Sequence, residues 1–107
     1  MFTRIVEITA KSGKAGELSR TVNEKVISIL RDQPGFVDEI VLVSDDNPDR
    51  VLALSFWKTR QDLEKYGREV FPRVNDVIRN LFADTPQVRT FEVTTSTVRE
   101  IVGERAA

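Results

Sequence analysis

The two strands predicted over residues 36–44 and 50–57 are apolar on both sides, which limits the folds open to this chain. In the later strand, Leu52, Leu54 and Phe56 form one apolar side. The alternate residues from Val51 to Trp57 form a second side that is also mostly apolar. A sheet with helices on one face and water on the other alternates apolar with polar residues. We therefore expect an apolar cover on both faces of this sheet.

The earlier strand repeats the pattern. Its two apolar sides are Phe36, Ile40 and Leu42, and Val37, Val41 and Val43. No remaining segment is large enough to cover the second face, because the chain after Val98 is short and charged. A second copy of the sheet is the simplest cover, through a twofold contact. We predict a homodimer with sheet-to-sheet packing; the alternative is a monomer with a modest apolar patch.

The order of the predicted elements indicates one α+β domain. The elements are a strand over 2–9, a helix over 17–32, strands over 36–44 and 50–57, a helical region broken at Pro72, and a strand over 88–98. This order is the split βαβ, or ferredoxin-like, plan, with helices on one face of a four-stranded antiparallel sheet. We place the domain at residues 1–98 and a short tail at 99–107.

The 107 residues include no cysteine and no histidine, which excludes several chemistries. A thiolate nucleophile, a Cys/His zinc site and a Ser-His-Asp triad are all ruled out. Acid–base chemistry near neutral pH then needs a perturbed Asp, Glu, Lys or Tyr, and the pattern offers no obvious base. The net charge of −1 gives no basic face for nucleic acid. With no membrane-spanning stretch and no signal segment, we expect a cytoplasmic protein.

The cluster of Asp45, Asn47 and Asp49 could suggest a calcium loop. The EF-hand pattern requires glycine at its sixth position and glutamate at its twelfth, and here these positions hold Arg50 and Phe56. We interpret the cluster as a hairpin turn and predict no metal site.

Two segments carry a family resemblance: the Gln-Pro-Gly-Phe run at 33–36 that opens the hairpin, and the Ser-Phe-Trp-Lys-Thr run at 55–59 that closes it. With the order of the elements around them, the chain from about Phe2 to Val98 resembles the antibiotic biosynthesis monooxygenase domain of the dimeric α+β barrel superfamily. The resemblance implies a homodimer whose sheets pack into a barrel. It also implies a ligand cavity in each subunit, between sheet and helices.

Members of this family differ in chemistry. Some oxygenate aromatic polyketides with molecular oxygen and no metal or flavin, others degrade haem, and others act on quinones or signalling molecules. The members that oxygenate polyketides need no metal or flavin, and by this resemblance we expect no cofactor here. Because this chain has no histidine for the axial position of a haem iron, we do not expect haem degradation.

Three residues are candidates for ligand binding. Trp57 could form an aromatic cavity wall or simply fill the core. Tyr66 could present its hydroxyl to a ligand or bond to a backbone partner. Asn23 could point its amide into the cavity or into solvent. Arg4 interrupts an apolar strand side, and we expect it to orient an anionic ligand or to pair with an acid such as Glu92.

Two functions from different classes follow from this pattern. The first is a cofactor-independent monooxygenase that binds a small aromatic substrate, a phenol, quinol or polyketide-like molecule, in an apolar pocket between sheet and helices. The second is a non-catalytic dimeric module that binds a small ligand or serves a structural role. A pocket lined by Trp57 and Tyr66 would favour ligand binding, and a filled interior a structural role.

Overall fold

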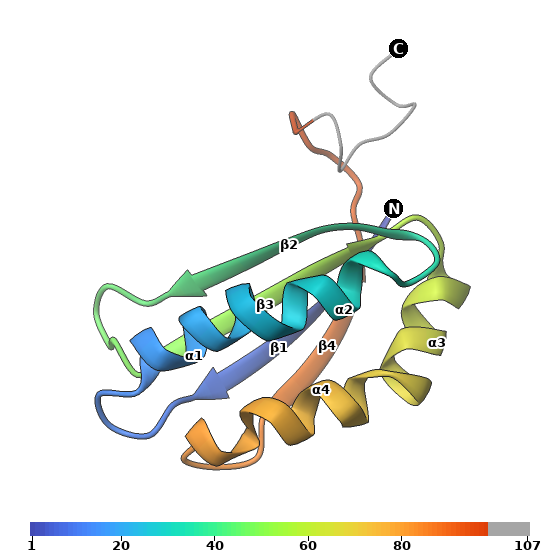
Figure 1. Ribbon diagram of the computed structural model, residues 1–107. Helices are drawn as coiled ribbons and strands as arrows, with labels where there is room; N and C mark the ends of the chain where they lie inside the picture. The colour runs from blue at the N-terminus through green and yellow to red at the C-terminus, as the bar shows by residue number, and fades with distance from the viewer. Residues whose placement is uncertain (99–107) are drawn as a thin grey trace.

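A computed structural model describes residues 1–98 of the chain, and the sheet within it has ferredoxin-like topology (Figure 1). The strands are β1, Phe2–Thr9, β2, Phe36–Val43, β3, Arg50–Trp57, and β4, Gln87–Glu92. Their order across the sheet is β2-β3-β1-β4, and all neighbours are antiparallel. This confirms the predicted α+β fold and its four-stranded antiparallel sheet.

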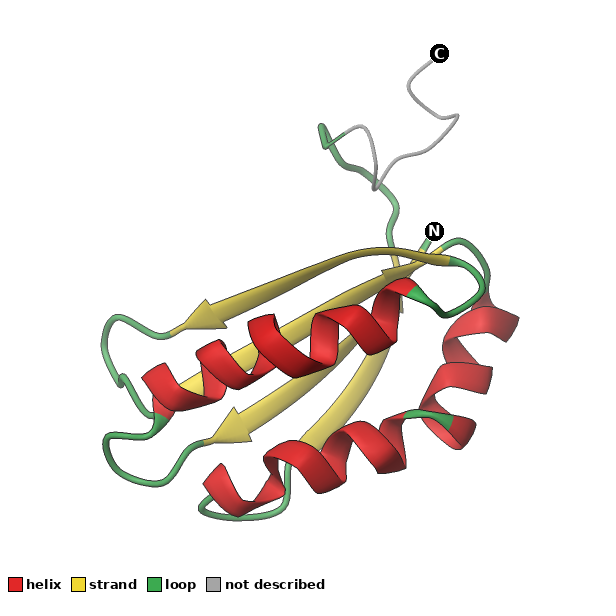
Figure 2. Cartoon of the chain, in the orientation of Figure 1, coloured by secondary structure: helices red, strands yellow, loops and turns green. Residues whose placement is uncertain are grey.

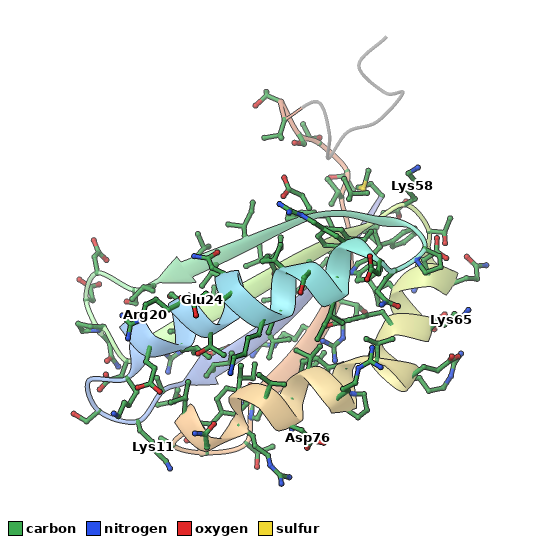
Figure 3. The ribbon with its side chains drawn as sticks, viewed as in Figure 1. Lys11, Arg20, Glu24, Lys58, Lys65 and Asp76 are labelled. Carbon is green, nitrogen blue, oxygen red and sulfur yellow. The ribbon has the colours of Figure 1, made fainter. Side chains whose placement is uncertain are left out.

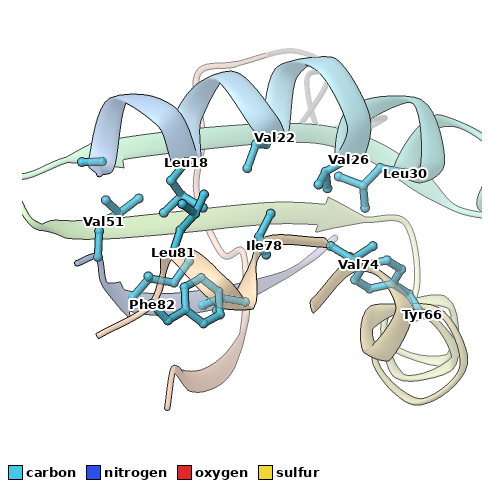
Figure 4. Packing of buried hydrophobic residues seen from close by; sticks show 14 of the residues in the cluster. Leu18, Val22, Val26, Leu30, Val51, Tyr66, Val74, Ile78, Leu81 and Phe82 are labelled. Carbon is cyan, nitrogen blue, oxygen red and sulfur yellow. The ribbon is translucent and has the colours of Figure 1, made fainter. Parts of the chain in front are cut away.

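Two helical runs lie on the same face of the sheet (Figure 2). The first consists of α1, Ala15–Thr21, the π-helical η1, Val22–Val26, and α2, Ile27–Arg31. The second consists of α3, Arg60–Glu69, α4, Phe71–Ile78, and the 3₁₀ turn η2, Arg79–Leu81. The core lies between these runs and the sheet, where Val22 and Val26 face Val74 and Ile78 across the interior (Figure 4).

The π-helical turn in the first run has a cause in the sequence. Leu18, Val22, Val26 and Leu30 are all buried and recur at intervals of four residues. Four residues overshoot the 3.6 residues of an α-helical turn, so this stripe would rotate away from the sheet in a regular helix. A π turn is wider, because its bonds join residues five apart. Placing it at η1 keeps all four side chains on the core, within what we predicted as one regular helix.

The second helical run begins and breaks as the sequence predicts. The Thr59 side chain caps α3 by accepting a hydrogen bond of 3.1 Å from the Asp62 backbone N–H. Pro72 lies in the first turn of α4, where a missing N–H costs nothing, so the helix restarts there in a new direction. Gly35, at φ 78°, turns the chain into β2, and a Cβ at this position would collide with the Asp62 side chain.

One predicted strand face is wrong. We expected Phe36 to share a side with Ile40 and Leu42, but Phe36 pairs with Trp57 while Asp38 pairs with Phe56. The extra residue between them forms a β-bulge, which moves Phe36 to the other face. Its ring therefore packs beneath the helices, edge-on to Trp57 with the ring centroids 5.6 Å apart.

The last strand is shorter than predicted. We expected it to run over 88–98, but β4 ends at Glu92, which lies opposite Phe2 at the start of β1. Because β1 is the only strand beside β4 among the described residues, the ladder stops where β1 begins. One further backbone bond joins Val93 N–H to the Met1 carbonyl at 2.9 Å. The predicted tail at 99–107 lies outside the described residues.

Within residues 1–98 no helix covers the second face of the sheet (Figure 1), and this face is strongly apolar. Strand register places Ile5, Ile40, Leu52, Leu54 and Phe56 on this face, with Leu42 and Phe91 toward its two edges. Leu42 is 47% exposed and Phe91 is 51% exposed. The two-sided apolar strands inferred from the sequence are therefore present, and the homodimer that would cover this face stays a prediction.

Candidate functional site

A small cavity lies between the sheet and the two helical runs. Its volume is about 30 Å³. Most of its wall is aliphatic, and Figure 4 shows Val22, Val26, Val74 and Ile78 converging from the two helical runs. The polar residues in the wall are Arg4, Glu39, Ser55 and Tyr66. Each comes from a different element, so only the folded chain brings them together.

Arg4 carries a cation into this apolar wall. The residue is only 7% exposed, and its position on β1 directs it to the helix-covered face between Phe2 and Val6. Its Cζ lies 4.0 Å from the centroid of the Phe71 ring and 5.6 Å from that of Tyr66. Within residues 1–98 its guanidinium forms no ion pair and no hydrogen bond. Its contacts include two aromatic rings, which stabilise a cation only modestly.

Gly67 on α3 makes room for this arginine. A Cβ built at Gly67 would lie 3.2 Å from the Nε atom of Arg4, which is closer than ordinary packing allows. A side chain at this position would push the guanidinium off its place beside Tyr66. The glycine therefore helps to set the position of the Arg4 head group.

Glu39 carries a carboxyl group into the same cavity from β2. It lies opposite Ser55 in the ladder, on the helix-covered face. Its Oε1 atom is enclosed and has no hydrogen-bond partner among the described residues. Burial raises the pKa of the Glu39 carboxyl to about 8, with Asp38 adding to the rise and Arg4 opposing it. Glu39 therefore holds a proton at neutral pH and releases it just above.

Tyr66 links the cavity to the aromatic core behind it. Its ring stacks on Trp57 with centroids 4.8 Å apart, and it meets Phe71 edge-on at 6.3 Å. Burial raises the pKa of the Tyr66 phenol, so the hydroxyl stays neutral. Within the described part of the chain this hydroxyl forms no hydrogen bond, so the alternative of a backbone partner for Tyr66 is not found there.

Trp57 supports the site from behind. It is fully buried and its indole N–H donates a 2.9 Å hydrogen bond to Ser55 Oγ. The Ser55 hydroxyl in turn donates to the Arg4 carbonyl at 3.4 Å. Trp57 is not part of the cavity wall, so its contacts are those of a core residue that fixes Tyr66 and Ser55.

Two further sequence expectations are placed elsewhere by the fold. Asn23 is exposed on η1, on the side away from its wall-lining neighbour Val22. The predicted pairing of Arg4 with Glu92 is wrong, because Glu92 lies opposite Phe2 and is exposed at the sheet edge. The structure therefore brings Tyr66 to the cavity, puts Trp57 behind it, and leaves Asn23 in solvent.

Glu39 is the functional candidate that sequence reasoning missed. The signal was present, because Glu39 alternates with Val37, Val41 and Val43 on one side of its strand, as Arg4 does on β1. A charged residue on an apolar strand side lies in the interior if that side is the covered one. The sequence pattern showed no obvious base, and the structure adds Glu39 as a candidate, because its partly buried carboxyl has a pKa raised to about 8.

Most other charged side chains point outward. Figure 3 labels Lys11, Arg20, Glu24, Lys58, Lys65 and Asp76 around the outside of the molecule, and all six are exposed. Against this background, Arg4 and Glu39 stand out as charged residues that reach the interior. No group of His, Cys, Asp and Glu side chains within residues 1–98 is arranged to hold a metal ion. No helix in that part of the chain is long and apolar enough to cross a membrane.

The fold and the cavity together define a small α+β domain with a polar pair enclosed between sheet and helices. A model of the antibiotic biosynthesis monooxygenase family matches residues 1–69, and the chain therefore belongs to this family. The match includes Arg4, Glu39 and Tyr66, and it ends just before Phe71. This confirms the family resemblance seen in the sequence.

Solved structures show the same fold at low sequence identity. A putative antibiotic biosynthesis monooxygenase from Bordetella bronchiseptica has a TM-score of 0.76 and 17% identity, covering 88% of this chain and 97% of that one. A Streptomyces coelicolor monooxygenase in complex with nanaomycin D has a TM-score of 0.77 and 15% identity, and the match covers 91% of this chain and 90% of that one. SnoaB, a cofactor-independent oxygenase from Streptomyces nogalater solved as a mutant, has a TM-score of 0.73 and 19% identity. This match covers 91% of this chain and 96% of that one. No curated protein sequence matches the chain.

Proposed function

We propose that this protein is a cofactor-independent monooxygenase that acts on a small aromatic substrate with an acidic hydrogen, such as a phenol, quinol or anthrone. The observation that carries the proposal is Glu39, a partly buried carboxyl with one enclosed, unpartnered oxygen in an apolar cavity that Arg4 also lines. A general base works best when its pKa lies near the working pH. Glu39 meets this condition without a metal or a flavin.

The chemistry balances without an external reductant. Glu39 takes a proton from the substrate, leaving an electron-rich anion in the apolar cavity. This anion transfers electrons to molecular oxygen and forms a carbon–oxygen bond. In an anthrone, a CH₂ group becomes a carbonyl group, one oxygen atom enters the product and the other leaves as water. The substrate supplies all four electrons, so the protein contributes orientation and proton transfer.

Two of the structurally similar proteins support this class of reaction. SnoaB is a cofactor-independent oxygenase, and the Streptomyces coelicolor monooxygenase binds nanaomycin D. At 15–19% identity these likenesses concern the fold, so the proposal for this chain depends on Glu39 and its surroundings.

Entry of a substrate requires the cavity to widen. A volume of about 30 Å³ holds one or two water molecules. Pockets for ligands of drug size have volumes on the order of several hundred Å³. Phe71 is the natural gate, since it is only partly buried and begins α4 at the break after α3. Displacing its ring would open the wall next to Arg4 and Tyr66.

The test is oxygen uptake by the purified protein with a panel of anthrones and hydroquinones. We expect at least one of them to consume oxygen above the protein-free control, with a rate that rises with pH through about 8 as Glu39 ionises. Glu39→Gln should lower this rate by about 10²–10⁴-fold, the usual contribution of a general base. Glu64→Gln, the same change on the exposed surface of α3, is the matched control and should leave the rate unchanged. No uptake with any member of the panel, or equal rates for the two variants, would contradict the proposal.

The small cavity favours one alternative, a non-catalytic module. A nearly filled interior is what a structural role predicts. Phe71→Ala separates the two functions, because it enlarges the cavity without removing Glu39, Arg4 or Tyr66. Faster oxygen uptake in this variant supports the enzyme, and continued absence of uptake supports the module.

A further inference from the structure

We propose that Arg4 is the anion-binding group of the cavity, and that the ligand it takes is a flat apolar ring bearing one carboxylate or phenolate group. The inference names the substrate class of the site proposed above and rests on that site being the ligand cavity. It concerns binding, so its test does not require oxygen consumption. It begins from the unusual surroundings of the Arg4 side chain.

The first step is that Arg4 is charged and largely buried. A guanidinium remains protonated in proteins, and the Arg4 residue that carries this one is only 7% exposed. Burying a charge is costly unless opposite charge and hydrogen bonds compensate it. Here the N–H donors have no acceptor among residues 1–98, and the guanidinium nitrogens still reach solvent, because the enclosed unpartnered side-chain atoms in that range are Glu39 Oε1 and Asn75 Oδ1. The side chain is therefore able to donate hydrogen bonds to a ligand that reaches it.

The second step concerns the acidic groups around Arg4. Glu39 on β2 and Tyr66 on α3 are the other titratable residues in the cavity wall, and the remainder of the wall is aliphatic or aromatic apart from Ser55. Glu39 interacts with Arg4 through space but forms no ion pair with it. Because burial raises the pKa of Glu39 to about 8, it is mostly protonated at neutral pH and leaves the cation uncompensated.

The third step is the shape of the surroundings. The guanidinium carbon lies 4.0 Å from the centroid of the Phe71 ring and 5.6 Å from that of the Tyr66 ring. A flat ring that displaces Phe71 would meet the same guanidinium and the same tyrosine. Its anionic oxygen would accept hydrogen bonds from Arg4, and a hydroxyl hydrogen, where present, would point to the free Oε1 of Glu39. An arginine fork matches the two oxygens of a carboxylate especially well.

The test measures binding of benzoate and of benzamide, its neutral isostere, by nuclear magnetic resonance at constant ionic strength. The chain has one tryptophan and one tyrosine, so the Trp57 indole N–H and the Tyr66 ring signals report on this site alone. At pH 6.5 we expect benzoate to bind saturably and at least tenfold more tightly than benzamide. Binding should weaken as the pH rises through about 8, because ionised Glu39 then repels the anion.

Three variants sharpen the result. Arg4→Met keeps much of the side-chain volume and should abolish the preference for benzoate over benzamide. Glu39→Gln should bind benzoate with an affinity that no longer falls between pH 6.5 and 9.5. Arg89→Met, an exposed arginine on β4, is the control and should behave as wild type. If Arg4→Met fails to fold, the comparison of benzoate with benzamide on the wild-type protein still decides.

Equal binding of the two probes to the wild-type protein, or unchanged benzoate binding in folded Arg4→Met, would overturn the inference. These outcomes are separate from oxygen uptake. A protein that consumes oxygen but does not prefer benzoate retains the proposed function and loses the anion site. A protein that prefers benzoate but never consumes oxygen retains the anion site as part of a binding module.

Discussion

Charged side chains on the two faces of the sheet differ in whether they form ion pairs. On the open face, Glu7 of β1 lies 2.6 Å from Arg50 and 3.6 Å from Arg89, and all three side chains reach solvent. On the helix-covered face, Arg4 of the same strand and Glu39 form no ion pair with any residue in the described part of the chain. Strand β1 thus carries Glu7, a carboxylate with two ion pairs, on its open side and Arg4, a cation without one among the described residues, on its covered side.

This difference shows which charges have a structural partner and which are available for chemistry. Exposed ion pairs are inexpensive because water solvates both partners, and they contribute little stability. Largely buried ionisable groups without partners lower the stability of the fold, so they call for an explanation outside stability. We therefore regard Glu7, Arg50 and Arg89 as surface structure, and Arg4 and Glu39 as the site.

The largest effect is expected from removing the support behind the site. Trp57→Ala deletes the stacking on Tyr66 and the hydrogen bond to Ser55, and leaves a large hole in the core. We expect the free energy of unfolding to fall by about 3–5 kcal/mol, the usual cost of such a truncation. Urea unfolding measures it. A loss as small as that of Lys58→Ala, an exposed neighbour, would show that Trp57 does not hold the covered face together.

The next effect is a dependence of stability on pH that comes from Glu39. Its pKa in the unfolded chain is ordinary, near 4.3, and in the folded protein it is about 8. Between these values the folded state retains a proton that the unfolded state has lost, so stability falls as the pH rises from about 4.5 to 8, on the order of a few kcal/mol in total. Unfolding at several pH values measures this slope.

The matched comparison is Glu39→Gln, which removes the titrating group while keeping its size. We expect the variant to lose most of the slope and to be more stable than wild type at pH 9. Glu7→Gln should leave the slope in place, because Glu7 lies on the open face. The same slope in Glu39→Gln as in wild type would mean that the enclosed carboxyl does not titrate as described.

A further prediction concerns the open face. We expect the protein to be a dimer whose sheets pack on each other, and Leu54 lies near the middle of that face. Leu54→Lys should convert a two-chain particle into a one-chain particle in analytical ultracentrifugation at micromolar concentration, because a buried lysine is costly. Lys65→Leu on the outside of α3 is the control. A one-chain wild-type protein would remove the need for a partner sheet.

The smallest effect is expected at the surface ion pairs. Glu7→Gln breaks the contacts with Arg50 and Arg89, and both arginines are more than half exposed. We expect a loss of less than about 1 kcal/mol, which added salt should reduce further. Urea unfolding at low and high salt measures both. A loss comparable to that of Trp57→Ala would erase the contrast between the two faces.

Much of the fold could be predicted because it depends on local patterns. The alternation in β1 and β3, the cap at Thr59 and the break at Pro72 are each written in a few neighbouring residues. The errors arose where the outcome depends on distant partners. The bulge after Phe36 depends on register with β3, and the end of β4 depends on where β1 begins.

The site divides in the same way. The sequence by itself determined that no histidine or cysteine takes part, that Tyr66 lies on an apolar helix face, and that Arg4 interrupts an apolar strand side. Only the tertiary structure decided that Glu39 shares a cavity with Arg4, that Trp57 lies behind Tyr66, and that Asn23 faces solvent. The physical reason is that composition and periodicity are properties of short segments. The surroundings of a charge, and with them its pKa, arise from residues that the fold brings from β1, β2 and α3 into one place.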